Sequence, residues 1–407
     1  MAAERRIFHG WAVVAACFVV ASFGWGLGLF GASVYLQAIT AAHGWPVAKV
    51  ASAITVFLLV SAAAQRAVGR GIDRWGPQPV LALGTVAMAG GVALLGQASA
   101  PWQLYPCFVL VGIGWSTLST TAISATVAPW FARHQGRSIT LAIMGASVGA
   151  IAGVPLLLLA VARLGLGAGL AMAGLVAACV LLPLIGRVLR FRGPAELGLR
   201  RDGDAPPKDV APPAADPPVA TPANRRALLW SAALGFALGL NVQLGFITHH
   251  LALAEPLLGT VGAGLLVSAT GLVAFIGRLV LARIADGVHV RRLAAVILLL
   301  QTAALLALAL WPSVPVLIGA SLAYGYAIGH VTTLAPVVVR REFGAAGFGA
   351  TYGSAATVIG FASAFGPALF GMLRDAFGGY GPSLMLASLA TLAGSAALLL
   401  GGRERGR

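Results

Sequence analysis

Long apolar stretches fill most of the chain, and Pro, Gly and clusters of charge separate them. Each stretch is near the ~20 residues that a helix needs to cross ~30 Å of hydrocarbon. Few stretches alternate polar with apolar residues, so the pattern predicts helices and does not fit a transmembrane β-barrel. Twelve transmembrane helices are predicted, near residues 10–41, 47–69, 78–98, 103–128, 137–161, 167–190, 227–253, 259–284, 292–311, 314–339, 346–374 and 380–401.

The composition agrees with a polytopic membrane protein. Of the 407 residues, 59% are hydrophobic and 10% are charged, and the mean hydropathy is +0.90, far from the values of soluble globular proteins. The first apolar stretch is too long for the core of a signal peptide and lacks a cleavage site, so we expect a retained helix. The predicted fold class is an all-α integral membrane protein.

A Pro-rich stretch divides the apolar segments into six and six, and such a sequence cannot bury a core. We predict an N-terminal six-helix bundle at 1–190, an extended cytoplasmic linker at 191–226 and a C-terminal six-helix bundle at 227–407. An offset of 213 residues relates the halves: it places Gly112 on Gly325, Gly136 on Gly349, Arg70 on Arg283 and Asp73 on Asp286. Two similar six-helix bundles are typical of an alternating-access transporter with its site at their interface.

The net charge of +15 has a membrane explanation. Of the 27 Lys and Arg residues, Lys49, Arg163 and Arg374 fall on the predicted outer side, Arg278 falls within a membrane segment, and the others fall on the cytoplasmic side. This asymmetry places both termini in the cytoplasm and the protein in the cytoplasmic (inner) membrane. It favours contact with anionic lipids over a nucleic-acid partner.

Arg278 is a cation inside a predicted membrane helix. At ~1.5 Å per residue it lies roughly 7 Å inward of Arg283 and about 12 Å inward of Asp286. A charge at that depth costs several kcal/mol, which favours a functional role. Its guanidinium can donate two parallel hydrogen bonds to a carboxylate. The structural alternative is that Arg278 extends to the cytoplasmic headgroups or braces Asp286. It shares a helix face with small and polar residues: Gly264, Ser268, Gly271, Phe275 and Ala282.

The remaining candidates are polar or aromatic residues of predicted membrane helices. None of the twelve acidic residues falls at the depth of Arg278, which favours an anionic substrate. Substrate-binding candidates besides Arg278 are Trp115, Ser119, Asn241, Tyr326 and His330. An imidazole titrates near pH ~6.5, so His250 is the candidate for proton coupling. The alternative for both histidines is a neutral ring hydrogen-bonded between helices.

Asp73 with Arg74, and Arg283 with Asp286, stand at equivalent cytoplasmic helix ends. They could bridge helices in one conformation and separate in another, as a conformational latch. The alternative is wet surface ion pairs worth ~0–1 kcal/mol. The three cysteines all fall in membrane segments without disulfide or metal spacing, and no nucleophile stands with a base. We therefore predict a protein that is not an enzyme and has no cofactor or metal.

Several motifs resemble those of the major facilitator superfamily. Gly69-Arg70-Gly71-Ile72-Asp73-Arg74-Trp75-Gly76 resembles its loop motif, and residues 282–286 repeat it more loosely. Gly10-Trp11-Ala12-Val13-Val14 and Trp130–Arg137 resemble the branch of monocarboxylate transporters and oxalate:formate antiporters. Arg278 falls where that branch carries its substrate-binding arginine. The resemblance implies a twelve-helix carrier of small organic anions.

The chain departs from this branch at positions that matter. Ala274 and Leu29 stand where animal-type monocarboxylate transporters have an aspartate and a lysine. The predicted helix at 346–374, where the oxalate carriers have a second cation, has none before Arg374. The resemblance therefore implies neither proton coupling through that aspartate nor a dianion held by two cations. We predict a monomeric secondary transporter for a monocarboxylate-type anion, working by proton symport or anion exchange. The alternative is an efflux pump for drugs or lipophilic metabolites.

Overall fold

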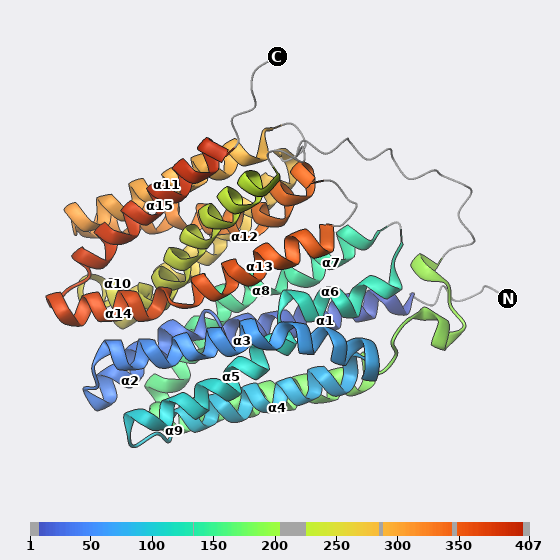
Figure 1. Ribbon diagram of the computed structural model, residues 1–407. Coiled ribbons are helices and arrows are strands. Elements are labelled where there is room, and N and C mark those ends of the chain that lie inside the picture. Colours follow the sequence, from blue (N-terminus) through green and yellow to red (C-terminus); the bar gives the residue numbers. More distant parts are fainter. Residues whose placement is uncertain (1–7, 133, 204–224, 285–287, 344–347, 402–407) are drawn as a thin grey trace, which may run out of the picture. The chain divides into compact units, whose positions relative to one another are not determined.

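The computed structural model describes residues 8–132, 134–203, 225–284, 288–343 and 348–401, and these residues form helices without strands (Figure 1). Within these ranges, ten helical stretches are long and apolar enough to cross a membrane. Two of the ten contain a non-helical glycine with positive φ, Gly165 (φ 80°) and Gly259 (φ 67°), a conformation that glycine adopts without strain. Division at these glycines gives twelve segments among the described residues, as the apolar pattern predicts.

The chain divides into two compact units, which we describe separately. The first comprises residues 1–42 and 56–211, and the second comprises residues 43–55 and 212–407. Most of the predicted linker, residues 204–224, lies outside the described part of the chain. One helix, α3, begins in the second unit and continues into the first. The elements of the first unit, α3 included, are α1 His9–Leu27, α2 Gly31–His43, α3 Val47–Trp75, α4 Pro77–Leu95, η1 Pro101–Gln103, α5 Leu104–Leu118, α6 Thr120–Val127, η2 Ala128–Trp130, α7 Gln135–Ile143, α8 Gly145–Val148, η3 Gly149–Gly153, α9 Val154–Val188, η4 Pro194–Leu197 and η5 Arg201–Gly203.

Three of the predicted membrane segments are each broken into two helices, and a fourth, 137–161, is divided among α7, α8, η3 and the start of α9. α1 ends at Leu27, whose carbonyl accepts a hydrogen bond from the Tyr35 hydroxyl at 2.7 Å, and α2 begins at Gly31. α5 ends before Ser119, which has an extended backbone. In the second unit, the predicted segment 346–374 breaks after Ala364, and its second helix begins at Gly366. Pro367 stands in the first turn of that second helix, where a missing N–H removes no helical hydrogen bond. Length and hydropathy predict the span in each case but not the break.

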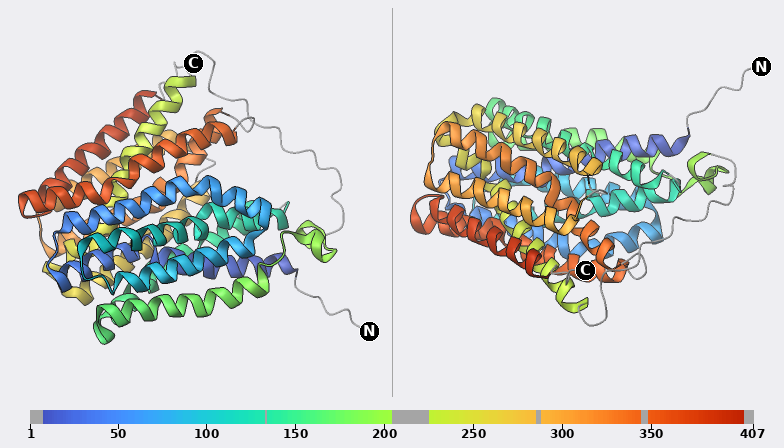
Figure 2. Two further views of the ribbon diagram at one scale, coloured as in Figure 1. Left: turned by 60° about the horizontal axis from the view of Figure 1, so that its bottom comes forward. Right: turned by 90° about the horizontal axis from the view of Figure 1, so that it is seen from above.

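The second unit packs its helices around a large apolar core. Its elements after α3 are α10 Arg225–Ile284, α11 Val290–Leu310, α12 Val314–Phe343, α13 Phe348–Ala364, α14 Gly366–Phe377 and α15 Gly381–Gly401. α11 and α15 lie side by side in Figures 1 and 2. Phe236 and Leu281 of α10, Leu298 of α11, Val331 of α12 and Leu398 of α15 are all buried in this core.

A buried ion pair joins four helices of the second unit. Arg291 and Glu342 are only 6% and 8% exposed, and one guanidinium nitrogen of Arg291 donates to both Glu342 carboxylate oxygens at 2.7 and 2.6 Å. The same side chain donates to the Leu398 carbonyl at 2.8 Å and to the Ser231 hydroxyl. The arginine thereby connects α10, α11, α12 and α15, whereas the charge pattern alone places Arg291 at a solvated helix end.

Candidate functional site

Arg278 lies away from the exposed apolar face of its helix. Val261, Leu265, Leu272, Ile276 and Leu279 form a stripe that is 40–78% exposed. With 3.6 residues per turn, the centre of this stripe is roughly 120° around the helix from Arg278. Arg278 is partly buried, on the side where Gly271 and Ala274 are buried. Its guanidinium is therefore not on the face that the helix presents to lipid.

Glycines bring α10 and α12 into close contact beside Arg278. A Cβ added to Gly277 would lie 2.7 Å from the Tyr326 carbonyl oxygen and 3.1 Å from the His330 ring. A Cβ added to Gly329 would meet the Ala274 carbonyl and would lie 3.1 Å from the backbone nitrogen of Arg278. The helices can approach this closely because glycine has no side chain. Three predicted binding residues, Arg278, Tyr326 and His330, thus lie along one helix seam.

The protonation of His330 follows from its hydrogen bond. Nδ1 is 2.9 Å from the Tyr326 carbonyl oxygen, which can only accept, so Nδ1 carries the proton. In the neutral ring Nε2 is then an acceptor. His330 is 0% exposed, and Nε2 has no hydrogen-bond partner among the residues that the structure describes. The Tyr326 ring lies 4.5 Å from the imidazole, so an aromatic wall adjoins this acceptor.

His250 and Asn241 contact neighbouring helices from the first half of α10. The His250 Nε2 atom lies 3.0 Å from the Ser321 hydroxyl of α12, and its ring packs 4.7 Å from Phe246. His250 is 2% exposed. Asn241 donates from its amide nitrogen to the Ala362 carbonyl of α13 at 2.7 Å. Both side chains therefore connect helices, His250 with α12 and Asn241 with α13.

The two candidates of the first unit belong to a separate aromatic region. Trp115 of α5 packs 4.7 Å from Trp25 and 6.2 Å from Phe57, and its ring lies against Gly28. The Ser119 hydroxyl donates to the Ser116 carbonyl at 2.9 Å and is buried. Ser119 therefore satisfies its own helix end, while Trp115 remains partly buried.

The predicted latch residues are exposed where the structure describes them. Asp73, Arg74 and Arg283 all lie at exposed positions, and Asp286 lies outside the described residues. The Arg74 guanidinium lies 5.7 Å from the Trp75 ring centre, and the Arg74 carbonyl accepts a hydrogen bond from Arg192 at 3.1 Å. The latch stays a prediction.

His249 forms a second buried histidine site, which the sequence did not predict. Its Nε2 atom donates to the Pro367 carbonyl at 2.9 Å, and its Nδ1 atom lies 3.0 Å from the Tyr380 hydroxyl. Since Nε2 carries the proton of the neutral ring, Nδ1 is an acceptor and the Tyr380 hydroxyl donates to it. The paired histidines at 249 and 250 were a visible signal, but the two partners lie more than a hundred residues away. No group of three or more potential metal ligands occurs among the described residues.

Comparisons with known proteins agree with this architecture. The family model described as Major Facilitator Superfamily matches residues 14–367. Monocarboxylate transporter 11 of Homo sapiens is 28% identical over 412 residues, covering 95% of this chain and 81% of that protein. The oxalate:formate antiporter of Oxalobacter formigenes is 26% identical over 161 residues, covering 40% of this chain and 38% of that protein.

Two further matches concern efflux and fold. The multidrug resistance protein MdtH of Shigella dysenteriae serotype 1 (strain Sd197) is 36% identical over 81 residues, 20% of each chain. The solved structure of the nucleoside transporter NupG superposes with a TM-score of 0.73 at 10% identity, covering 97% of this chain and 100% of that one. At that identity the structural match concerns the fold alone.

Proposed function

Because this chain belongs to the Major Facilitator Superfamily, we propose that it is a secondary transporter of a small monocarboxylate and that Arg278 binds the carboxylate. It acts in the cytoplasmic membrane as a monomer with both termini in the cytoplasm. The observation that carries the proposal is the place of Arg278: a cation of a membrane helix, away from the exposed apolar stripe and on the seam with Tyr326 and His330.

Arg278 suits a carboxylate better than a neutral substrate. Its planar fork matches both oxygens of a carboxylate, and such charge-assisted hydrogen bonds are about twice as strong as neutral ones. The similarity to a monocarboxylate transporter over 95% of this chain supports the same substrate class. With a single cation assigned to binding, one carboxylate is the natural cargo.

His330 and Tyr326 give the site a way to recognise the rest of the substrate. A buried acceptor without a partner costs about 1–3 kcal/mol. A substrate hydroxyl that donates to His330 Nε2 would recover part of that energy. The aromatic ring of Tyr326 offers an apolar surface to a short carbon chain beside this acceptor. These contacts favour a monocarboxylate that carries a hydroxyl group.

Transport then proceeds by alternating access. Two bundles rock about the bound anion, and Asp73, Arg74, Arg283 and Asp286 stabilise one of the two states. Trp115, Ser119 and Asn241 line the path. Two couplings fit: proton symport through His250, or exchange of one anion for another.

Uptake by purified protein in liposomes tests the proposal. Labelled lactate, pyruvate, formate and oxalate are offered with and without an imposed pH gradient, beside Arg278→Gln. We expect saturable uptake of monocarboxylates by the wild-type protein and a large loss in the variant. Normal uptake by Arg278→Gln would overturn the assignment of the anchor.

Efflux of lipophilic compounds is the second candidate, favoured by the 36% identity with MdtH over a short region. It predicts that cells lacking the protein become drug-sensitive while growth on carboxylates is unchanged. In that case Arg278 would be dispensable for export. The variant Arg278→Gln therefore distinguishes the two functions, because it should lose carboxylate uptake but retain drug export.

A further inference from the structure

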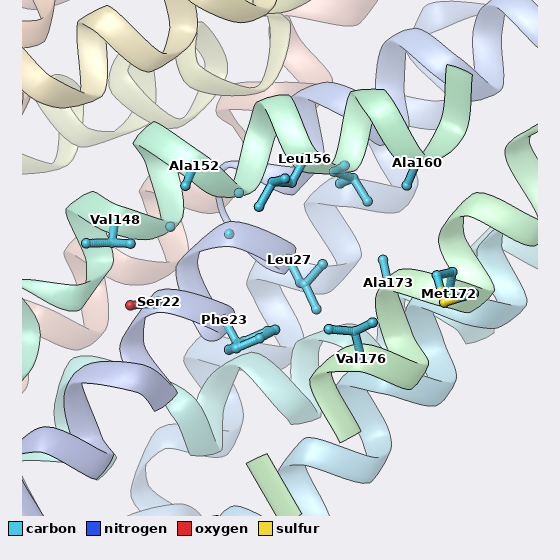
Figure 3. A pocket seen from close by; sticks show the side chains of 14 residues that line it. Ser22, Phe23, Leu27, Val148, Ala152, Leu156, Ala160, Met172, Ala173 and Val176 are labelled. Atoms are coloured by element: carbon cyan, nitrogen blue, oxygen red, sulfur yellow. The ribbon is translucent and has the colours of Figure 1, made fainter. Parts of the chain in front are cut away.

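An apolar groove opens on the surface of the first unit, apart from every residue assigned to transport. It has a volume of about 380 Å³. Ser22, Phe23, Gly26 and Leu27 of α1 form one side, and Figure 3 shows the facing side chains of α8, η3 and both halves of α9. Leu156, Ala160, Met172, Ala173 and Val176 of α9 are among these facing residues.

The floor of the groove is a backbone contact between glycines. A Cβ on Gly153 would lie 3.0 Å from the Gly26 Cα atom, and one on Gly26 would lie 3.3 Å from the Gly149 carbonyl oxygen. η3 is a π-helical turn, a distortion that is often found at functional sites. Because glycines stand on both sides of this contact, the backbones of α1 and η3 approach each other closely, and residues from both halves of α9 line the groove beside it.

The groove faces outward and offers nothing to a polar ligand. Leu156, Met172 and Val176 on its walls are 64%, 45% and 43% exposed. Its one hydroxyl, on Ser22, already donates to the Phe18 carbonyl at 2.9 Å. All the lining residues belong to helices that span the membrane. The occupant must therefore be apolar and must arrive from the bilayer.

We propose that this groove binds one acyl chain of a phospholipid. Pockets of roughly 300–1,000 Å³ hold single small ligands. A flexible hydrocarbon chain is thin enough to follow the glycine floor, and van der Waals contact along both walls retains it.

Arg163 indicates at which end of the groove the lipid headgroup lies. It follows the lining residue Ala160 by three positions, so it lies on the same helix face about 4.5 Å further along the axis. It is exposed and stands two residues before the turn at Gly165. A guanidinium at a membrane helix end binds phosphate oxygens well. The acyl chain thus occupies the groove while the lipid phosphate contacts Arg163.

Photo-cross-linking in nanodiscs tests this proposal. Phosphatidylglycerol with a diazirine on one acyl chain is incorporated, irradiated, and located by mass spectrometry of the peptides. We expect label to concentrate on the groove peptides of α1 and α9. Ala173→Trp, which fills the groove, should reduce that label at least fivefold, whereas Ala168→Trp, at an exposed alanine of the same helix outside the lining, should leave it unchanged.

The headgroup is tested separately. Arg163→Gln should retain the label from phosphatidylglycerol with reduced occupancy at limiting lipid, and native mass spectrometry should show fewer retained phospholipids. Thermal unfolding of each variant confirms that it is folded. Label spread evenly around the membrane belt, label insensitive to Ala173→Trp, or groove peptides cross-linked to a second copy would each overturn the proposal.

Discussion

Arg278 carries a permanent charge at a partly buried position in a membrane helix. Such a charge costs free energy, which favours a functional role for the residue. A guanidinium cannot lose its proton under physiological conditions, so the protein cannot relieve the cost by titration. The helix instead turns it away from the stripe through Leu279. What the residue contributes to transport should therefore depend on the shape of its donor group as well as on its charge.

Substitution of Arg278 separates charge from shape. Arg278→Gln removes a charge-assisted interaction worth about 1.5–3 kcal/mol, so we expect monocarboxylate uptake to fall roughly 10- to 100-fold. Arg278→Lys keeps the charge but loses the fork, so its uptake should fall between wild type and Gln. Initial uptake rates in liposomes measure both. Equal rates in all three proteins would contradict a carboxylate contact.

His330 should determine preference among substrates. His330→Phe keeps a planar aromatic ring but removes the Nε2 acceptor. If that acceptor receives a substrate hydroxyl, uptake of lactate should fall about tenfold, corresponding to a hydrogen bond of about 1–1.5 kcal/mol. Uptake of propionate, which has no hydroxyl, should change little. A parallel loss of both substrates would indicate a purely structural role for the ring.

At the scale of helices, glycine contacts fix how close α10 and α12 can lie. Gly329→Ala places a methyl group against the Ala274 carbonyl, and such overpacking typically costs about 1–3 kcal/mol. We expect a lower thermal unfolding temperature and weaker transport, because Arg278 lies on the same seam. Gly319→Ala on the same helix is the matched control, since its Cβ would meet nothing within 4 Å. Unchanged stability in Gly329→Ala would show that the helices can separate freely.

A second prediction at this scale concerns the buried ion pair between Arg291 and Glu342, which connects helices of the second unit. Arg291→Met removes the guanidinium from the buried contact with Glu342, and breaking a buried pair on one side typically costs about 3–5 kcal/mol. Arg292→Met, at the exposed neighbouring position, should cost much less. The double variant Arg291→Met, Glu342→Met should recover part of the loss, because both charges of the buried pair are then replaced by apolar side chains. Thermal unfolding in detergent compares the four proteins, and a double variant no more stable than Arg291→Met would contradict this account.

At the scale of the molecule, the sequence predicted what hydropathy controls. The number and span of the membrane helices follow from length and polarity, so breaks at Gly165 and Gly259 fall where the predicted segments end or begin. Side-chain partners were not predictable in the same way. Gly277 and His330 meet from positions 53 residues apart, and His249 meets Pro367, because helix packing rather than local pattern determines these pairs.

Coupling to protons is a property of the whole transport cycle, and His250 provides its test. In proton symport the carrier binds a proton and the anion on the acidic side and releases both on the other side, so an acidic exterior should accelerate uptake. His250→Gln removes the site of that proton and should abolish gradient-driven accumulation. Exchange of labelled for unlabelled anion should persist in the variant, because the carrier then crosses loaded with anion in both directions and no step requires release of a proton. His289→Gln, at an exposed position, is the control and should retain both activities. Wild-type uptake that ignores the gradient but requires anion on the opposite side would instead assign anion exchange and leave His250 as a helix contact to Ser321.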